Sequence, residues 1–211
     1  LGVRLAGHGT SPWDLKERSW RDWLNSVRRG YRILSAFCDK VIVIGFSMGG
    51  ALSLRFAAER PDKLVGVASV SVPIAYRDRG MAFVPLVHNL NKLASWLPSF
   101  EGIMPFREND SEHPDINYHQ IPIHGLYQLR TLTNELQDHL AEIDAPSLII
   151  QGNEDPVVEP ESGRIIYNEL VIADKALHWI PSDRHGILNE DIGDTRDLLH
   201  NFIERVTDDN T

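Results

Sequence analysis

The chain has 211 residues, 42% of them hydrophobic and 24% charged, which is ordinary for one domain with a full core. Its formal net charge of -9 argues against a nucleic-acid partner, which attracts a basic surface, and against a basic membrane-surface helix. The sequence holds no run of roughly 18 apolar residues, so we expect no integral membrane segment.

Four apolar segments rich in β-branched residues predict strands buried on both faces, as in parallel sheets. These segments are residues 41–46, 63–70, 146–151 and 176–180. The short stretch 3–5 is interpreted as the end of a further strand.

Helical patterns fall between these strands. Ser19 is expected to cap a helix whose apolar residues continue at helical spacing to Leu34. Residues 48–59, 160–170 and 191–205 predict three further helices. The alternation of strands and helices predicts an α/β fold with a mainly parallel sheet.

The segment 73–140 departs from this alternation, since it is long and rich in proline and histidine. A connection of this length in a compact α/β pattern is usually functional. We expect a mostly helical cap, inserted into a core formed by residues 1–72 and 141–211. Two interpretations stay open for its apolar side chains, an acyl pocket or the cap's own small core: Met81, Phe83, Leu86, Trp96, Leu97, Phe100, Met104 and Phe106.

Residues 45–49 read Gly-Phe-Ser-Met-Gly and match the nucleophile-elbow pattern G-x-S-x-G. A predicted strand precedes the motif and a predicted helix follows it, as an elbow requires. Ser47 is therefore the predicted nucleophile. Positions 45 and 49 are expected to require a small residue because the turn packs closely, and both hold glycine. The main-chain N–H of Met48, at the start of the helix, is expected to serve the oxyanion hole.

His185 is the predicted general base. A serine nucleophile needs a base and an orienting carboxylate. In folds with a nucleophile elbow these follow the serine in the order acid, then histidine. His185 stands in a loop directly after the segment 176–180. His178 lies inside that strand and His200 lies on the last helix, so neither is as well placed.

Asp155 is the predicted orienting acid, because it follows the strand 146–151 directly. Glu154 ranks second. Asp144 precedes its strand, and Asp174 lies at the opposite strand end. The structural alternative is that Asp155 only caps the turn before a proline.

Together these segments resemble the carboxylesterase and monoacylglycerol-lipase branch of the α/β-hydrolases. The resemblance covers the elbow at 45–50, the segment 152–158, the loop 182–186 and the stretch 4–12. Ala6 stands where that family usually has proline. The resemblance implies an α/β-hydrolase fold with a small cap between the sixth and seventh family strands, and a serine esterase activity.

The resemblance also implies a gap at the N-terminus. In the family, three strands precede the stretch corresponding to 4–12, and a loop among them gives the second oxyanion N–H. The pair His8-Gly9 is not interpreted as that loop, since its context matches the later stretch. We therefore expect the N-terminal strands to be absent from this chain. The complete protein is expected to be several tens of residues longer, which an intact-mass measurement of the natural product would check.

The sequence thus predicts hydrolysis of short or medium acyl esters, or of monoacylglycerol, through an acyl-enzyme on Ser47. The expected partner is a small-molecule ester or lipid. We expect no cofactor and no metal, since His113, His119 and His124 lack a zinc-binding spacing. The alternatives are a thioesterase or lysophospholipase using the same residues, and a catalytically inactive binding protein on the same scaffold.

The single cysteine, Cys38, rules out a disulfide within this sequence. It stands in an apolar run, where we expect it to be buried. A chain without disulfides is typical of a reducing compartment, so we expect a cytoplasmic location.

Overall fold

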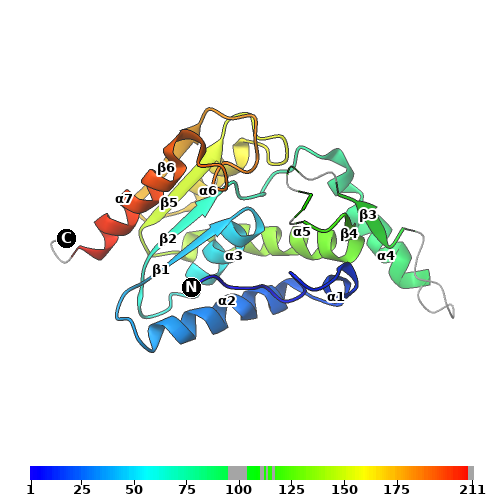
Figure 1. Cartoon of the computed structure of the whole chain (residues 1–211), viewed down its shortest axis with the longest axis horizontal. Coiled ribbons are helices and arrows are strands. Elements are labelled where there is room, and N and C mark those ends of the chain that lie inside the picture. The colour runs from blue at the N-terminus through cyan, green and yellow to red at the C-terminus, as the bar shows by residue number, and fades with distance from the viewer. Residues whose placement is uncertain (95–103, 110–111, 113, 116, 209–211) are drawn as a thin grey trace.

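The computed structural model describes residues 1–94, 104–109, 112, 114–115 and 117–208. Its main sheet has four strands in the order β1-β2-β5-β6, and every neighbouring pair is parallel (Figure 1). The four predicted strands are confirmed within one residue at each end. Their bounds are β1 Val41–Phe46, β2 Leu64–Val70, β5 Ser147–Gly152 and β6 Lys175–Ile180. The expected strand at 3–5 is wrong, because these residues form no regular element.

The helices between the strands are also confirmed, with one shifted boundary. The first long helix begins after Ser19, whose main-chain N–H donates to the Asp22 carboxylate at 2.8 Å. The last α-helix begins about four residues later than predicted, because Asp191, Gly193 and Asp194 have positive φ angles that an α-helix does not accommodate. A short 3₁₀ element, η3 Ile192–Asp194, precedes it. The bounds are α1 Pro12–Lys16, α2 Trp20–Ser35, α3 Met48–Ala57, α6 Glu161–Glu169 and α7 Thr195–Thr207.

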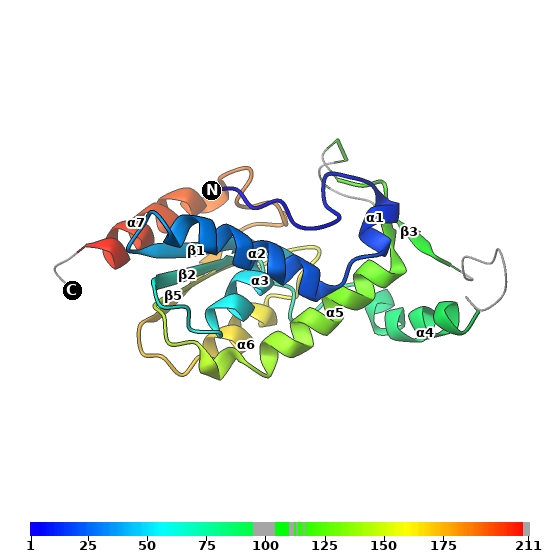
Figure 2. The same ribbon diagram turned by 90° about the horizontal axis from the view of Figure 1, so that it is seen from below.

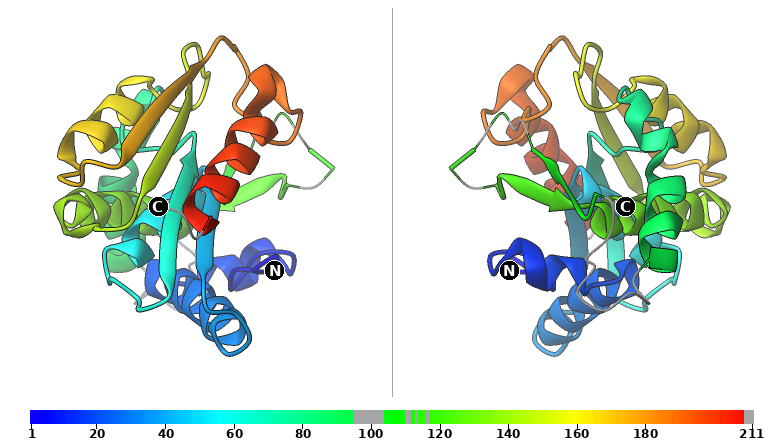
Figure 3. Two further views of the ribbon diagram at one scale, coloured as in Figure 1. Left: turned by 90° about the vertical axis from the view of Figure 1, so that its left-hand side faces the viewer. Right: turned by 90° about the vertical axis from the view of Figure 1, so that its right-hand side faces the viewer.

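Helices cover both faces of the sheet, as the left view of Figure 3 shows. Helices α2, α3 and α6 pack on one face and α7 packs on the other. Successive strand residues therefore point to different cores, with Val67 in the larger core and Ala68 in the smaller. This arrangement explains why the strands read as continuous apolar runs.

The segment 73–140 contains helices and a small antiparallel sheet. The described elements are η1 Arg79–Ala82, α4 Val84–Ala94, β3 Phe106–Glu108, β4 Gln120–Pro122, α5 Ile123–Gln137 and η2 Leu140–Glu142. The expectation of a mostly helical cap missed the pairing of β3 with β4. Three of the apolar residues singled out above, Trp96, Leu97 and Phe100, lie outside the described residues, as does His113.

Helix α5 extends beneath the sheet alongside α3 (Figure 2). Its residues Leu132 and Leu136, with Leu140 just after it, are fully buried in the larger core beside Leu52 and Leu54. The last part of the segment 73–140 thus supplies core side chains. The division of the chain into core and cap stays a prediction, and this burial favours counting α5 with the core.

Cys38 is exposed, so the expectation of burial is wrong. It lies between the end of α2 and the start of β1, and the neighbouring Phe37 is 86% exposed. The apolar run reflects a helix end whose outer side no described element covers. Among the described residues, no helix combines the length and the apolar character needed to cross a membrane.

Substituting Leu136 should test whether α5 belongs to the cooperative core. We expect Leu136→Ala to lower the free energy of unfolding by about 2–5 kcal/mol, because the truncated side chain leaves a buried cavity. The matched control is Leu86→Ala on α4, where the side chain is 58% exposed and the loss should stay within about 0.5 kcal/mol. Urea unfolding followed by circular dichroism measures both, and equal losses would contradict the assignment of α5 to the core.

Candidate active site

Ser47 occupies the sharp turn between β1 and α3. Its backbone angles, φ 52° and ψ -122°, lie in a region that residues with a side chain rarely adopt. The turn is held because the Ser47 N–H donates to the carbonyl of Val70 at 2.7 Å, which extends the β1–β2 ladder by one bond. The serine hydroxyl therefore stands at the carboxyl end of the sheet and at the N-terminus of α3.

The glycines of the motif contribute unequally to this turn. A Cβ on Gly45 would collide with the main chain of Gly49 and Gly50, and one on Gly50 would approach Val72 Cγ2 to 2.6 Å. A Cβ on Gly49 would meet nothing within 4 Å. The expectation that Gly49 must be small is therefore wrong. The second glycine that the packing requires is Gly50, which lies on the side of α3 facing β1.

His185 reaches Ser47 from the loop that follows β6. Its Nε2 lies 3.0 Å from Ser47 Oγ, although the two residues are 138 positions apart in the chain. The imidazole also packs against the ring of Phe46, with 4.9 Å between ring centroids. The parallel sheet brings these residues together because the carboxyl ends of β1 and β6 lie at the same edge.

Asp155 is completely buried and uses both carboxylate oxygens. Oδ2 lies 2.8 Å from His185 Nδ1, while Oδ1 accepts from the N–H groups of Val157 and Val158 at 2.8 and 2.9 Å. Since an ionised carboxylate can only accept, the imidazole carries its proton on Nδ1 and presents a bare Nε2 to the Ser47 hydroxyl. The turn-capping and orienting interpretations of Asp155 therefore both describe the structure.

The other candidate acids and bases lie away from this arrangement. Glu154, second in the sequence ranking, is exposed beside the buried Asp155. The other ranked candidates, Asp144, Asp174, His178 and His200, are exposed. Three of them form surface ion pairs: Asp144 with Arg60, Asp174 with Arg205 and His200 with Glu204. His178 points outward from β6.

Met48 is the first residue of α3, so its N–H belongs to the first turn, where main-chain donors lack acceptors within the helix. This N–H adjoins Ser47, at the positive end of the helix dipole. Met48, which follows Ser47 in the chain, also lines a cavity of about 160 Å³. The cavity is lined mainly by apolar residues, namely Leu15, Trp23, Met48, Ile121, Gly125, Leu126 and Leu129, together with His8, Asn109, Asn117 and Tyr118.

His8 and Trp23 were not expected at this site from the sequence. The His8 ring makes an edge contact with Trp23 at 5.8 Å, and its Nδ1 lies 3.2 Å from the carbonyl of Ala6. Burial lowers the pKa of His8, and the hydrogen bond to Ala6 only partly opposes this effect. His8 is therefore a neutral side chain of the cavity wall near neutral pH.

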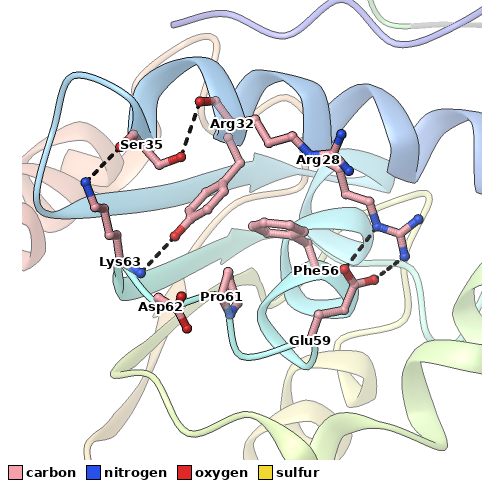
Figure 4. A pocket seen from close by; sticks show the side chains of 9 residues that line it. Arg28, Arg32, Ser35, Phe56, Glu59, Pro61, Asp62 and Lys63 are labelled. Atoms are coloured by element: carbon pink, nitrogen blue, oxygen red, sulfur yellow. Dashed lines mark hydrogen bonds and ion pairs between the residues drawn. The ribbon is translucent and has the colours of Figure 1, made fainter.

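A second cavity, of about 430 Å³, lies at the opposite ends of the strands (Figure 4). Three of its charged side chains are held by neighbours: Arg28 binds Glu59, and Lys63 Nζ donates to the carbonyl of Ser35 at 2.8 Å. Because Ser47 stands at the carboxyl end of β1, this cavity is remote from the nucleophile. Among the described residues, no group of three or more His, Cys, Asp or Glu side chains is arranged to hold a metal.

Comparison with known proteins identifies the family. The family model described as "Serine aminopeptidase, S33" matches residues 5–192, which include Ser47, Asp155 and His185. The chain belongs to this family. It is therefore a serine hydrolase of the α/β-hydrolase fold, as its resemblance to that fold implied.

Two relatives agree with this assignment, and a solved structure has the same fold. The chain is 29% identical to a thermostable monoacylglycerol lipase of Bacillus sp. (strain H-257), over 86% of this chain and 69% of the relative. It is 27% identical to a carboxylesterase of Bacillus subtilis (strain 168), over 95% and 78% of the two chains. A structure from a study of the metagenome-derived lipolytic enzymes LipS and LipT shares the fold, with a TM-score of 0.79 at 24% identity, over 96% of this chain and 79% of that one.

Alanine substitutions should separate the two glycines of the motif. We expect Gly45→Ala to destabilise the fold by roughly 1–3 kcal/mol or more, because its Cβ has no space against the α3 main chain. Gly49→Ala should change stability by less than about 1 kcal/mol, since its Cβ meets open space. Thermal unfolding measures the difference. Equal destabilisation by the two substitutions would show that the turn is not packed as described.

Proposed function

We propose that this chain hydrolyses carboxylic esters with small or medium acyl groups, monoacylglycerols included, through an acyl-enzyme on Ser47. The observation that carries the proposal is the continuous hydrogen-bonded path from Ser47 through His185 to the buried Asp155. A hydroxyl that is bonded to a bare imidazole nitrogen can lose its proton to that nitrogen as it attacks a carbonyl.

In the first half of the reaction, Ser47 Oγ forms a bond to the carbonyl carbon while its proton moves to His185 Nε2. The carbonyl oxygen becomes an oxyanion. When the tetrahedral intermediate collapses, the bond to the alcohol oxygen breaks and the imidazolium returns the proton to the leaving alcohol. In the second half, water takes the place of the alcohol, and the acid is released with Ser47 restored.

Asp155 supports both halves of the reaction through charge and orientation. Its Oδ2 stabilises the imidazolium that forms when His185 takes the serine proton. Its Oδ1 is fixed by the N–H groups of Val157 and Val158, so the carboxylate cannot rotate away from the imidazole. These two bonds give the acid its orientation in advance of substrate binding.

The oxyanion develops near the N-terminus of α3, where the Met48 N–H is the proposed donor. One donor of this kind contributes about 2.7–4 kcal/mol of transition-state stabilisation in well-studied hydrolases. The helix dipole acts in the same direction, because its positive end faces the developing negative charge.

The cavity beside Met48 supports a short or medium acyl group. Its volume of about 160 Å³ is close to that of an engineered apolar cavity of about 150 Å³ that takes up benzene. An acyl chain of roughly benzene size therefore fits, whereas a long chain would have to extend beyond this cavity. The two Bacillus relatives, named a monoacylglycerol lipase and a carboxylesterase, support an ester rather than a peptide as the substrate.

The proposal includes a cytoplasmic location. It is supported by Cys38, whose thiol is exposed and which has no second cysteine in this sequence to pair with. An exposed thiol of this kind is typical of proteins kept in a reducing compartment.

Two substitutions test the roles proposed for the site. Ser47→Ala should lower kcat for p-nitrophenyl butyrate by at least about 10⁴-fold, because the nucleophile is removed. Asp155→Asn should cost roughly 10⁴-fold as well. Its amide oxygen can still accept from Val157 and Val158, but its NH₂ would then donate to Nδ1 and move the imidazole proton to Nε2. Steady-state kinetics measures both losses.

A fluorescent organophosphonate provides the control, since labelling depends on the nucleophile and not on a particular ester. Ser47→Ala should abolish labelling and Asp155→Asn should slow it greatly, while circular dichroism spectra stay those of the unchanged chain. Ester hydrolysis that survives in Ser47→Ala would refute the proposed mechanism.

The acyl preference can be measured with p-nitrophenyl esters of increasing chain length. We expect kcat/KM to peak between about four and eight acyl carbons, because the cavity takes up a group of about benzene size. Leu126→Trp, which narrows the cavity, should shift the optimum to shorter chains, and Leu86→Trp on the exposed face of α4 should not. An aminoacyl p-nitroanilide is the contrasting substrate. Faster cleavage of the anilide than of every ester would overturn the ester assignment.

A further inference from the structure

The loop that carries His185 has no regular structure, so its main-chain N–H groups need acceptors from elsewhere. One side chain accepts from two of them. Glu112 Oε1 accepts from the N–H of His185 at 3.0 Å, and Oε2 accepts from the N–H of Gly186 at 3.1 Å. Both carboxylate oxygens are thus bonded to successive residues of the loop.

Glu112 comes from a distant part of the chain, 73 positions before His185 and inside the segment 73–140. Its side chain is 23% exposed, and Arg184 Nε lies 3.5 Å from Oε1. Burial raises the pKa of Glu112, but the N–H groups of His185 and Gly186 and the charge of Arg184 bring it below its ordinary value overall. The carboxylate is therefore ionised near neutral pH, which strengthens its hydrogen bonds.

We propose that Glu112 is a positioning residue for His185, holding the loop main chain so that Nε2 stays within hydrogen-bond reach of Ser47. In this arrangement two carboxylates fix the histidine at two points, Asp155 at the ring and Glu112 at the main chain. A misplacement of a catalytic group by about 1 Å can lower the rate about 10²-fold. The expected effect on rate rests on the proposed ester hydrolysis. The positioning itself rests on the loop geometry.

The contacts of Glu112 distinguish it from a catalytic acid or base. Its oxygens bond to main-chain N–H groups, whereas the imidazole ring is bonded to Asp155 and Ser47. Glu190 offers a matched comparison, because its carboxylate binds the same Arg184 at 2.7 Å. The N–H groups of His185 and Gly186 donate to Glu112.

Amide hydrogen exchange tests the positioning without any substrate. In the full chain, Glu112→Ala should speed exchange of the His185 and Gly186 amides by roughly 10-fold or more, because both acceptors are lost. Glu112→Gln keeps one acceptor oxygen and should give a smaller increase. Glu190→Gln should leave these two rates within about twofold.

Steady-state kinetics on p-nitrophenyl butyrate tests the consequence for catalysis, with active sites counted by organophosphonate titration. We expect Glu112→Ala to lower kcat per titrated site by about 10- to 100-fold while KM changes by less than about twofold. Glu112→Gln should fall between Glu112→Ala and the unchanged chain. Glu190→Gln should match the unchanged chain.

Unchanged exchange at His185 and Gly186 in Glu112→Ala would overturn the proposal. So would faster exchange across the whole chain with kcat per site retained, since that pattern indicates only a loss of stability. If Glu112→Ala does not fold, Glu112→Gln decides by the same criteria. If the unchanged chain proves inactive on every ester, the ester assignment fails, and the exchange measurement still decides whether Glu112 holds the loop.

Discussion

The close contact between the end of β1 and the start of α3 is the constraint on which the site depends. Gly45 and Gly50 allow the two main chains to touch, and the chain can then turn through the strained conformation of Ser47. Strain of this kind persists only where the surrounding structure enforces it. Here it is enforced by the bond from the Ser47 N–H to Val70 and by the burial of α3 against the sheet.

The rest of the site follows from the parallel sheet. The carboxyl ends of β1, β5 and β6 meet at one edge, so residues far apart in the chain converge there. Asp155 illustrates how one side chain can satisfy structure and chemistry together: one oxygen closes a turn and the other orients an imidazole. Its burial is tolerable because each oxygen has a donor.

The features that could be predicted from the sequence are those with a local pattern. The strands appear as apolar runs, and Ser47, Asp155 and His185 stand directly after such runs in an order typical of the fold. The unequal roles of Gly49 and Gly50 could not be predicted, because they depend on which side of α3 faces β1. The contact of Glu112 with the histidine loop joins residues 73 positions apart, and no spacing rule indicates it.

Helix α5 has a further consequence for how this chain can be recombined with its relatives. Leu132, Leu136 and Leu140 pack in the larger core with α3, although they belong to the segment 73–140, which the sequence predicts to be an inserted cap. A chimera that exchanged the whole segment 73–140 would replace part of the hydrophobic interior along with the cover of the site. A functional exchange would have to begin and end upstream of α5, so that α5 stays with the sheet on which it packs.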